Sequence, residues 1–96
     1  MRTSISRISV YFSGHVQGVG FRHGVLQVAR GFIVTGTVAN MADGRVQLEG
    51  EGEQVELEAF LAEVKDSLSS LISQTEEGWG TGAPRFKDFI IVPGLV

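Results

Sequence analysis

The sequence contains no cysteine, so it cannot form disulfides or use thiolate chemistry. Only two histidines are present and the carboxylates do not cluster, which argues against a dedicated zinc site. No apolar run is long enough to span a bilayer, and residues 1–7 lack the apolar core of a signal peptide. These absences predict a cytoplasmic protein with no membrane partner.

Positive charge is also scarce, because 8 Lys and Arg side chains stand against 11 Asp and Glu side chains. The net charge of −3 argues against binding to nucleic acid, which requires a positive field. A chain of 96 residues, 43% of them hydrophobic, can bury a core of its own. No repeat, linker or low-complexity tract divides it, so we expect residues 1–96 to form a single domain and a monomer.

Hydrophobic periodicity predicts alternating strands and helices. Period-two alternation indicates strands at 5–13 and on both sides of an Asp-Gly turn at 41–44, while helical spacing begins at Phe21 and stops at Gly31. In chain order we expect strand 5–13, a helix from 21, strands 34–40 and 45–49, a break at 50–53, a helix through 57–68, strand 71–77, loop 78–84 and strand 86–92. This order predicts a ferredoxin-like α+β sandwich, with two helices on one face of a mostly antiparallel sheet and a fifth, C-terminal strand.

A glycine-rich loop separates the first expected strand from the first expected helix. It reads Gly14-His15-Val16-Gln17-Gly18-Val19-Gly20-Phe21-Arg22. A turn with so little side-chain bulk leaves backbone N–H groups free, and the start of a helix favours an anion. The loop therefore predicts a phosphate cradle with Arg22 as its fixed positive charge.

Asn40 is expected to lie at the same edge of the sheet as this loop. Strands joined through a crossover helix run parallel, so strands 5–13 and 34–40 end at one edge. The loop follows the first of these strands, and Asn40 is the last residue of the second. Backbone N–H groups, a guanidinium and a side-chain amide are thus predicted to face one pocket.

The loop from Gly14 to Arg22 resembles the acylphosphatase signature, and residues 36–46 resemble the second conserved segment of that family. Residues 89–91 are similar to its last strand. The resemblance implies a metal-independent hydrolase that needs no cofactor and converts an acyl phosphate to a carboxylate and inorganic phosphate. It implies that Arg22 binds the phosphoryl group, that Asn40 orients the attacking water, and that backbone amides form the cradle. The cradle residues would be Gln17, Gly18, Val19, Gly20, Phe21 and Arg22. Thr37 and Ala39 depart from the family pattern, which often has a tryptophan and a basic residue there.

The chemistry of the two side chains agrees with these roles. Phosphoryl transfer has a loose transition state, so a protein mainly positions groups and stabilises charge. An asparagine amide does not titrate in the useful range, but it can accept from and donate to a water molecule. We therefore take Asn40 as a water-positioning residue, with a phosphate oxygen of the substrate accepting the proton.

Other functions remain as alternatives. The loop fits a non-catalytic phosphate- or anion-binding module, although retention of both Arg22 and Asn40 argues against that. The chain also resembles the acylphosphatase-like domain of hydrogenase-maturation carbamoyltransferases. An RNA-recognition module on the same plan would need several aromatic residues on a basic sheet surface. Tyr11 is the only outward aromatic of the first strand and the net charge is negative, which argues against that function.

Several polar residues near these motifs are given structural roles. We expect His15 and His23 to face solvent rather than act in acid–base catalysis. The Glu49, Glu51 and Glu53 run is taken as a solvated turn and helix start. Trp79 is expected to be a packed or partly exposed loop residue.

Overall fold

The computed structural model describes residues 5–93, and the expected alternation of strands and helices is present. The strands are β1 (Ile5–Gly14), β2 (Val34–Asn40), β3 (Val46–Gly52), β4 (Ile72–Gly82) and β5 (Phe89–Ile91). The helices are α1 (Phe21–Ala29) and α2 (Gln54–Ser67), followed by a 3₁₀ turn, η1 (Ser69–Leu71). Arg30 is the C-cap of α1, so Gly31 stands just beyond the cap, as the sequence predicts.

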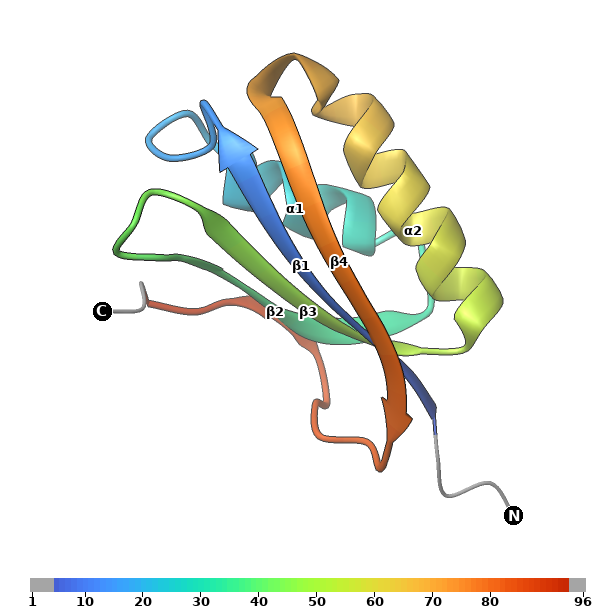
Figure 1. The fold of residues 1–96 in the computed structure, drawn as a ribbon. Coiled ribbons are helices and arrows are strands. Elements are labelled where there is room, and N and C mark those ends of the chain that lie inside the picture. The colour runs from blue at the N-terminus through green and yellow to red at the C-terminus, as the bar shows by residue number, and fades with distance from the viewer. Residues whose placement is uncertain (1–4, 94–96) are drawn as a thin grey trace.

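The strands form one sheet in the order β4-β1-β3-β2-β5. β3 is antiparallel to both β1 and β2, β4 is antiparallel to β1, and β5 is parallel to β2. β1 and β2 therefore run in the same direction, as a crossover through α1 requires. Both helices cover the same face of the sheet (Figure 1), which confirms the ferredoxin-like plan.

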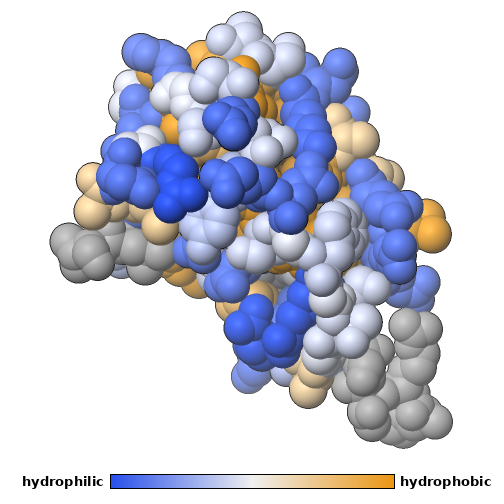
Figure 2. All heavy atoms as spheres, viewed as in Figure 1, coloured by the Kyte–Doolittle hydropathy of each residue, from blue (hydrophilic) through white to orange (hydrophobic). Residues whose placement is uncertain are grey.

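The hydrophobic core lies between the two helices and the sheet. Its buried side chains alternate along the strands and recur at helical spacing: Ile8, Val10, Phe12, Val38, Val46, Leu48, Phe21, Val25, Ala29, Leu57, Phe60, Leu61 and Val64. Phe60 packs against Phe32 and Phe89, with ring centroids 6.0 and 5.5 Å apart. Burying each such ring contributes about 1.5–3 kcal/mol. The surface in Figure 2 is accordingly hydrophilic or intermediate over most of the visible face.

The expected strand break at residues 50–53 is wrong, because β3 continues through Gly52. Its glycines mark close approaches rather than a turn. A Cβ on Gly50 would lie 3.2 Å from side-chain atoms of both Ile8 and Leu57, so the glycine allows these side chains to pack closely over β3. The solvated role expected for Glu51 is also wrong, because this residue is 1% exposed.

The expected loop at 78–84 is largely wrong as well, because β4 extends through Gly82. Ile8 pairs with Trp79 and Arg7 with Gly80, so pairing with β1 overrides the turn preference of the glycines. Trp79 is a strand residue rather than a loop residue, and it is 43% exposed. β5 is shorter than expected and spans residues 89–91 rather than 86–92.

Candidate active site

The glycine-rich loop leaves β1 at a tightly packed corner. A Cβ on Gly14 would lie 2.6 Å from Leu71 O, and the next N–H, of His15, donates to the same carbonyl at 2.9 Å. The side chain of Val16 is 1% exposed and anchors the loop in the core. Beyond this anchor the chain turns through Gly18 and Gly20 at φ of +77° and +82°. Glycine adopts these left-handed angles without strain, so Gly18 and Gly20 allow the loop to turn at these two positions.

The loop presents a row of free backbone donors. Residues 5–93 supply no hydrogen-bond acceptor for the N–H groups of residues 17–23, and the first helical bond is from Gly24 N to Gly20 O. Gly20 is the N-cap of α1, and it provides no side-chain cap. The first turn also lacks an acidic side chain. Unpaired N–H groups at the positive end of a helix form a site for an anion.

Arg22 lies in this first turn of α1 and is half-buried. The ion pairs among residues 5–93 use Arg7, Arg45, Lys65 and Arg85 as cations, and Arg22 takes part in none of them. A guanidinium near the N-terminus of a helix is repelled by the helix dipole unless an anion is bound there. Its position adds to the positive potential of the loop amides.

Asn40 ends β2 on the helix-facing side of the sheet. Its backbone pairs with Val46 of β3, which in turn pairs with Phe12 of β1, so the three residues form one row. Val38, two residues earlier, faces the core, and the side chain of Asn40 shares that face. Asn40 Oδ1 is buried and has no hydrogen-bond partner among the described residues. An unpaired buried carbonyl costs about 1–3 kcal/mol, so a bound water or substrate atom is the natural partner.

An aromatic contact brings the start of α1 to the row that contains Asn40. The rings of Phe12 and Phe21 lie 5.2 Å apart, and Phe21 directly precedes Arg22. Phe12 and Asn40 lie two strand spacings apart in the row, which is about 10 Å. The loop and the turn after β2 accordingly lie at the same end of the sheet (Figure 1), as the crossover argument predicts.

The side chain of Gln17 makes a direct link that the sequence does not reveal. Its Nε2 donates to Met41 O at 2.9 Å and to Arg45 O at 3.0 Å, both in the β2–β3 hairpin. Because backbone carbonyls are present at every residue, the sequence carries no signal that these two would be the acceptors. His15 and His23, by contrast, are exposed, as expected.

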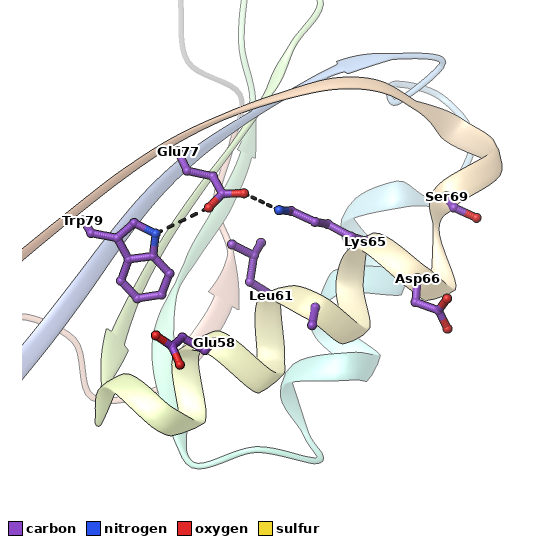
Figure 3. A pocket seen from close by; sticks show the side chains of 8 residues that line it. Glu58, Leu61, Lys65, Asp66, Ser69, Glu77 and Trp79 are labelled. Atoms are coloured by element: carbon purple, nitrogen blue, oxygen red, sulfur yellow. Dashed lines mark hydrogen bonds and ion pairs between the residues drawn. The ribbon is translucent and has the colours of Figure 1, made fainter.

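A cavity of about 530 Å³ lies elsewhere, between α2 and β4. Figure 3 shows that Lys65, Glu77 and Trp79 face one another across it, with Glu77 accepting from both other side chains. No residue of the glycine-rich loop or of β2 lines it. Cavity volume and anion-binding geometry therefore point to different places, and the free N–H groups favour the loop as the candidate site.

Comparison with known proteins bears on the family and the fold of this chain. The family model described as Acylphosphatase matches residues 8–91. The acylphosphatase of Archaeoglobus fulgidus is 47% identical over 58 residues, which cover 60% of this chain and 65% of that protein. The crystal structure of acylphosphatase from Bacillus subtilis superposes with a TM-score of 0.83 at 32% identity, covering 91% of this chain and 98% of that one. Full-length HypF in its phosphate- and nucleotide-bound form matches at a TM-score of 0.79 and 34% identity over 96% of this chain, but only 12% of HypF.

Proposed function

This chain belongs to the acylphosphatase family of enzymes, and we propose that it hydrolyses acyl phosphates at the loop between β1 and α1. The products would be a carboxylate and inorganic phosphate. The observation that carries the proposal is a set of unpaired polar groups at one end of the sheet. The N–H groups of residues 17–22, the free guanidinium of Arg22 and the buried Oδ1 of Asn40 all lack partners within residues 5–93.

The phosphoryl group would bind to the loop amides and to Arg22. The amides of Gln17, Gly18, Val19, Gly20, Phe21 and Arg22 would share its equatorial oxygens. A planar guanidinium can hold two phosphate oxygens at once, which fixes their orientation as well as their charge. Because the transition state is loose, this positioning and charge stabilisation supply most of the catalysis.

Asn40 would place the attacking water in line with the scissile bond. Its Oδ1 would accept a hydrogen bond from the water and orient a lone pair toward phosphorus. Such alignment lowers the barrier by reducing the entropy lost in the transition state. The buried, unpaired state of Oδ1 supports this role, because the atom is available and already shielded from bulk solvent.

No protein acid or base is required for the remaining proton transfers. The substrate's own phosphate oxygen would accept the proton of the attacking water, and the carboxylate leaves without protonation. The exposed histidines at 15 and 23 would not take part. The reaction would accordingly need no metal ion or other cofactor.

We further propose that residues 1–96 act as one domain, as a monomer in the cytoplasm. The family model already covers residues 8–91, which supports a single domain. The net charge of −3 argues against nucleic-acid or anionic membrane partners. The match covers only 12% of full-length HypF, so the alternative arrangement is a domain of this kind within a longer protein.

A hydrolysis assay with benzoyl phosphate in excess chelator tests the proposal. The wild-type chain is expected to turn over the substrate. Arg22→Ala is expected to lower the rate by at least about 10²–10³-fold. Asn40→Ala should lower kcat while inorganic phosphate still binds in calorimetry. Phosphate binding without turnover would instead identify a non-catalytic anion-binding module. Activity that survives Asn40→Ala would remove the water-positioning role.

A further inference from the structure

We propose that the side chain of Gln17 is a positioning residue, which locks the phosphate cradle to the strand end that carries Asn40. This inference rests on the proposed function, because it concerns the geometry between the bound phosphoryl group and the water. Gln17 would act twice, with its backbone N–H in the cradle and its side chain on the neighbouring hairpin. Neither the sequence pattern nor the family resemblance assigns a role to that side chain.

Both N–H groups of the Gln17 side-chain amide donate to the β2–β3 hairpin. Nε2 donates to Met41 O at 2.9 Å and to Arg45 O at 3.0 Å. These carbonyls also accept backbone bonds, from Gly44 N at 3.1 Å and Met41 N at 2.8 Å respectively. Because the hairpin turn keeps its own bonds, loss of the Gln17 amide would free the loop without opening the turn.

The two acceptors flank the last pair of residues in the β2–β3 ladder. Met41 directly follows Asn40, Arg45 directly precedes Val46, and Asn40 pairs with Val46. Gln17 therefore holds both strands at the level of Asn40. Its own N–H belongs to the cradle, so one residue connects the group that binds phosphate to the group that orients water.

The loop needs such a fastening because of its composition. Gly18 and Gly20 flank Val19, which is 38% exposed, and all three lie beyond the core anchor at Val16. Glycine gives this segment more conformational freedom than any other residue would. Without the Gln17 bonds, the exposed part of the loop would be fixed only at Val16 and at the start of α1.

The consequence falls on kcat more than on phosphate affinity. A displacement of about 1 Å between reacting groups can cost about 10²-fold in rate. We therefore expect Gln17→Met, which preserves side-chain length but removes both donors, to lower kcat by about 10- to 100-fold. The cradle amides remain, so the inhibition constant of inorganic phosphate should change by less than about threefold, since each amide bond is retained.

A double-mutant cycle with Asn40→Ala tests whether Gln17 acts through Asn40. In the wild-type background Gln17→Met should produce the stated loss of kcat, and in the Asn40→Ala background its further effect should be less than about threefold, because the group it positions is gone. Equal losses in both backgrounds would overturn the inference. A rise in the phosphate inhibition constant of Gln17→Met that matches its loss of kcat would also overturn the inference. This second measurement does not depend on the double variant, which can be too slow to assay.

Two further variants separate positioning from folding. Gln17→Asn keeps the amide but shortens it by one methylene, so it should reproduce the kcat loss with little change in thermal stability. Gln54→Met removes an exposed glutamine of α2 that bonds Glu58 at 3.0 Å, and it should leave kcat and phosphate inhibition unchanged. If the wild-type chain does not turn over benzoyl phosphate, the proposed function itself fails. If Asn40→Ala retains wild-type kcat, the water-positioning role of Asn40 fails, and the role of Gln17 fails with it. If Asn40→Ala is slow and Gln17→Met is not, only the role of Gln17 is overturned.

Discussion

The buried carboxylate of Glu51 is bound twice by Arg85, through the backbone N–H at 2.8 Å and through the guanidinium Nε at 3.1 Å. Phe86 N–H adds a third bond at 3.2 Å, and Arg7 Nε lies 3.2 Å from the same carboxylate. These contacts fasten the connection between β4 and β5 to the end of β3. Because Glu51 pairs with Arg7 near the start of β1, this cluster lies at the opposite end of the strand from the glycine-rich loop.

Glu51→Gln is therefore expected to weaken the fold and spare catalysis. The neutral amide loses the charge-assisted bonds and leaves buried donors poorly paired, which should lower the free energy of unfolding by about 2–3 kcal/mol. Urea denaturation measures this loss, and kcat should stay within about twofold, because the fold at the loop is unchanged. Glu49→Gln is the matched control. Its carboxylate is partly exposed and lies 3.7 Å from Arg85, so its loss should cost under about 1 kcal/mol. Equal losses from the two variants would contradict the special role of Glu51.

The same carboxylate predicts how stability depends on pH. Burial raises the pKa of Glu51, but hydrogen bonds from Arg85 and Phe86 and the charge of Arg85 outweigh it and hold the pKa below its ordinary 4.5. A lowered folded pKa contributes stability above the unfolded pKa, and that contribution is lost as pH falls through the folded value. Thermal unfolding from about pH 7 to about pH 2 should show the gap between wild type and Glu51→Gln shrinking on the acid side. A gap that stays constant over this range would rule out the linkage.

How much of this the sequence predicts depends on whether a feature is local. The alternation in β1, the stripe of α2 and the return of Asn40 to the loop follow from periodicity and topology. The burial of Glu51 does not, because its partners lie 34 and 35 residues away and its neighbours are glycines that resemble a turn. The sequence likewise does not predict that β4 extends through Trp79, because pairing with the distant strand β1 determines that extension. The sequence does not predict the hydrogen bonds of the Gln17 side chain, because their acceptors are ordinary backbone carbonyls.

A pair of glycine substitutions separates backbone conformation from available space. A Cβ on either Gly20 or Gly80 would meet no atom within 4 Å, but Gly20 has a φ of +82° and Gly80 has no left-handed φ. Gly20→Ala should therefore lower the free energy of unfolding by about 1–2 kcal/mol and weaken phosphate binding, because the loop amides change direction. Gly80→Ala should be neutral or stabilise the protein by up to about 1 kcal/mol, since alanine restricts the unfolded chain. Denaturation of both variants with and without phosphate measures the contrast, and a stabilised Gly20→Ala would show that the loop does not need its left-handed turn.

Arg22 is expected to lower the stability of the protein without a bound anion while it supports hydrolysis. Its guanidinium sits where the helix dipole is positive and has no carboxylate partner within residues 5–93, so removing the charge should relieve repulsion in the empty protein. Arg22→Glu is expected to leave stability unchanged or to raise it by about 0.3–1 kcal/mol, while hydrolysis of benzoyl phosphate falls by at least about 10²-fold. Arg22→Lys retains the charge but cannot form the paired bonds to two oxygens, so it should recover only part of the rate.

Phosphate itself provides the matching readout for Arg22. A ligand that binds only the folded state raises the melting temperature as its concentration increases, so phosphate should stabilise the wild-type chain but not Arg22→Glu. Arg30→Glu is a suitable control, because Arg30 is an exposed cation at the other end of α1 with a weak 3.4 Å bond to Gln27. It should retain the phosphate response and the hydrolytic rate. If Arg22→Glu instead unfolds more readily than Arg30→Glu while both still respond to phosphate, Arg22 is a packing residue of α1 and the anion is held without it.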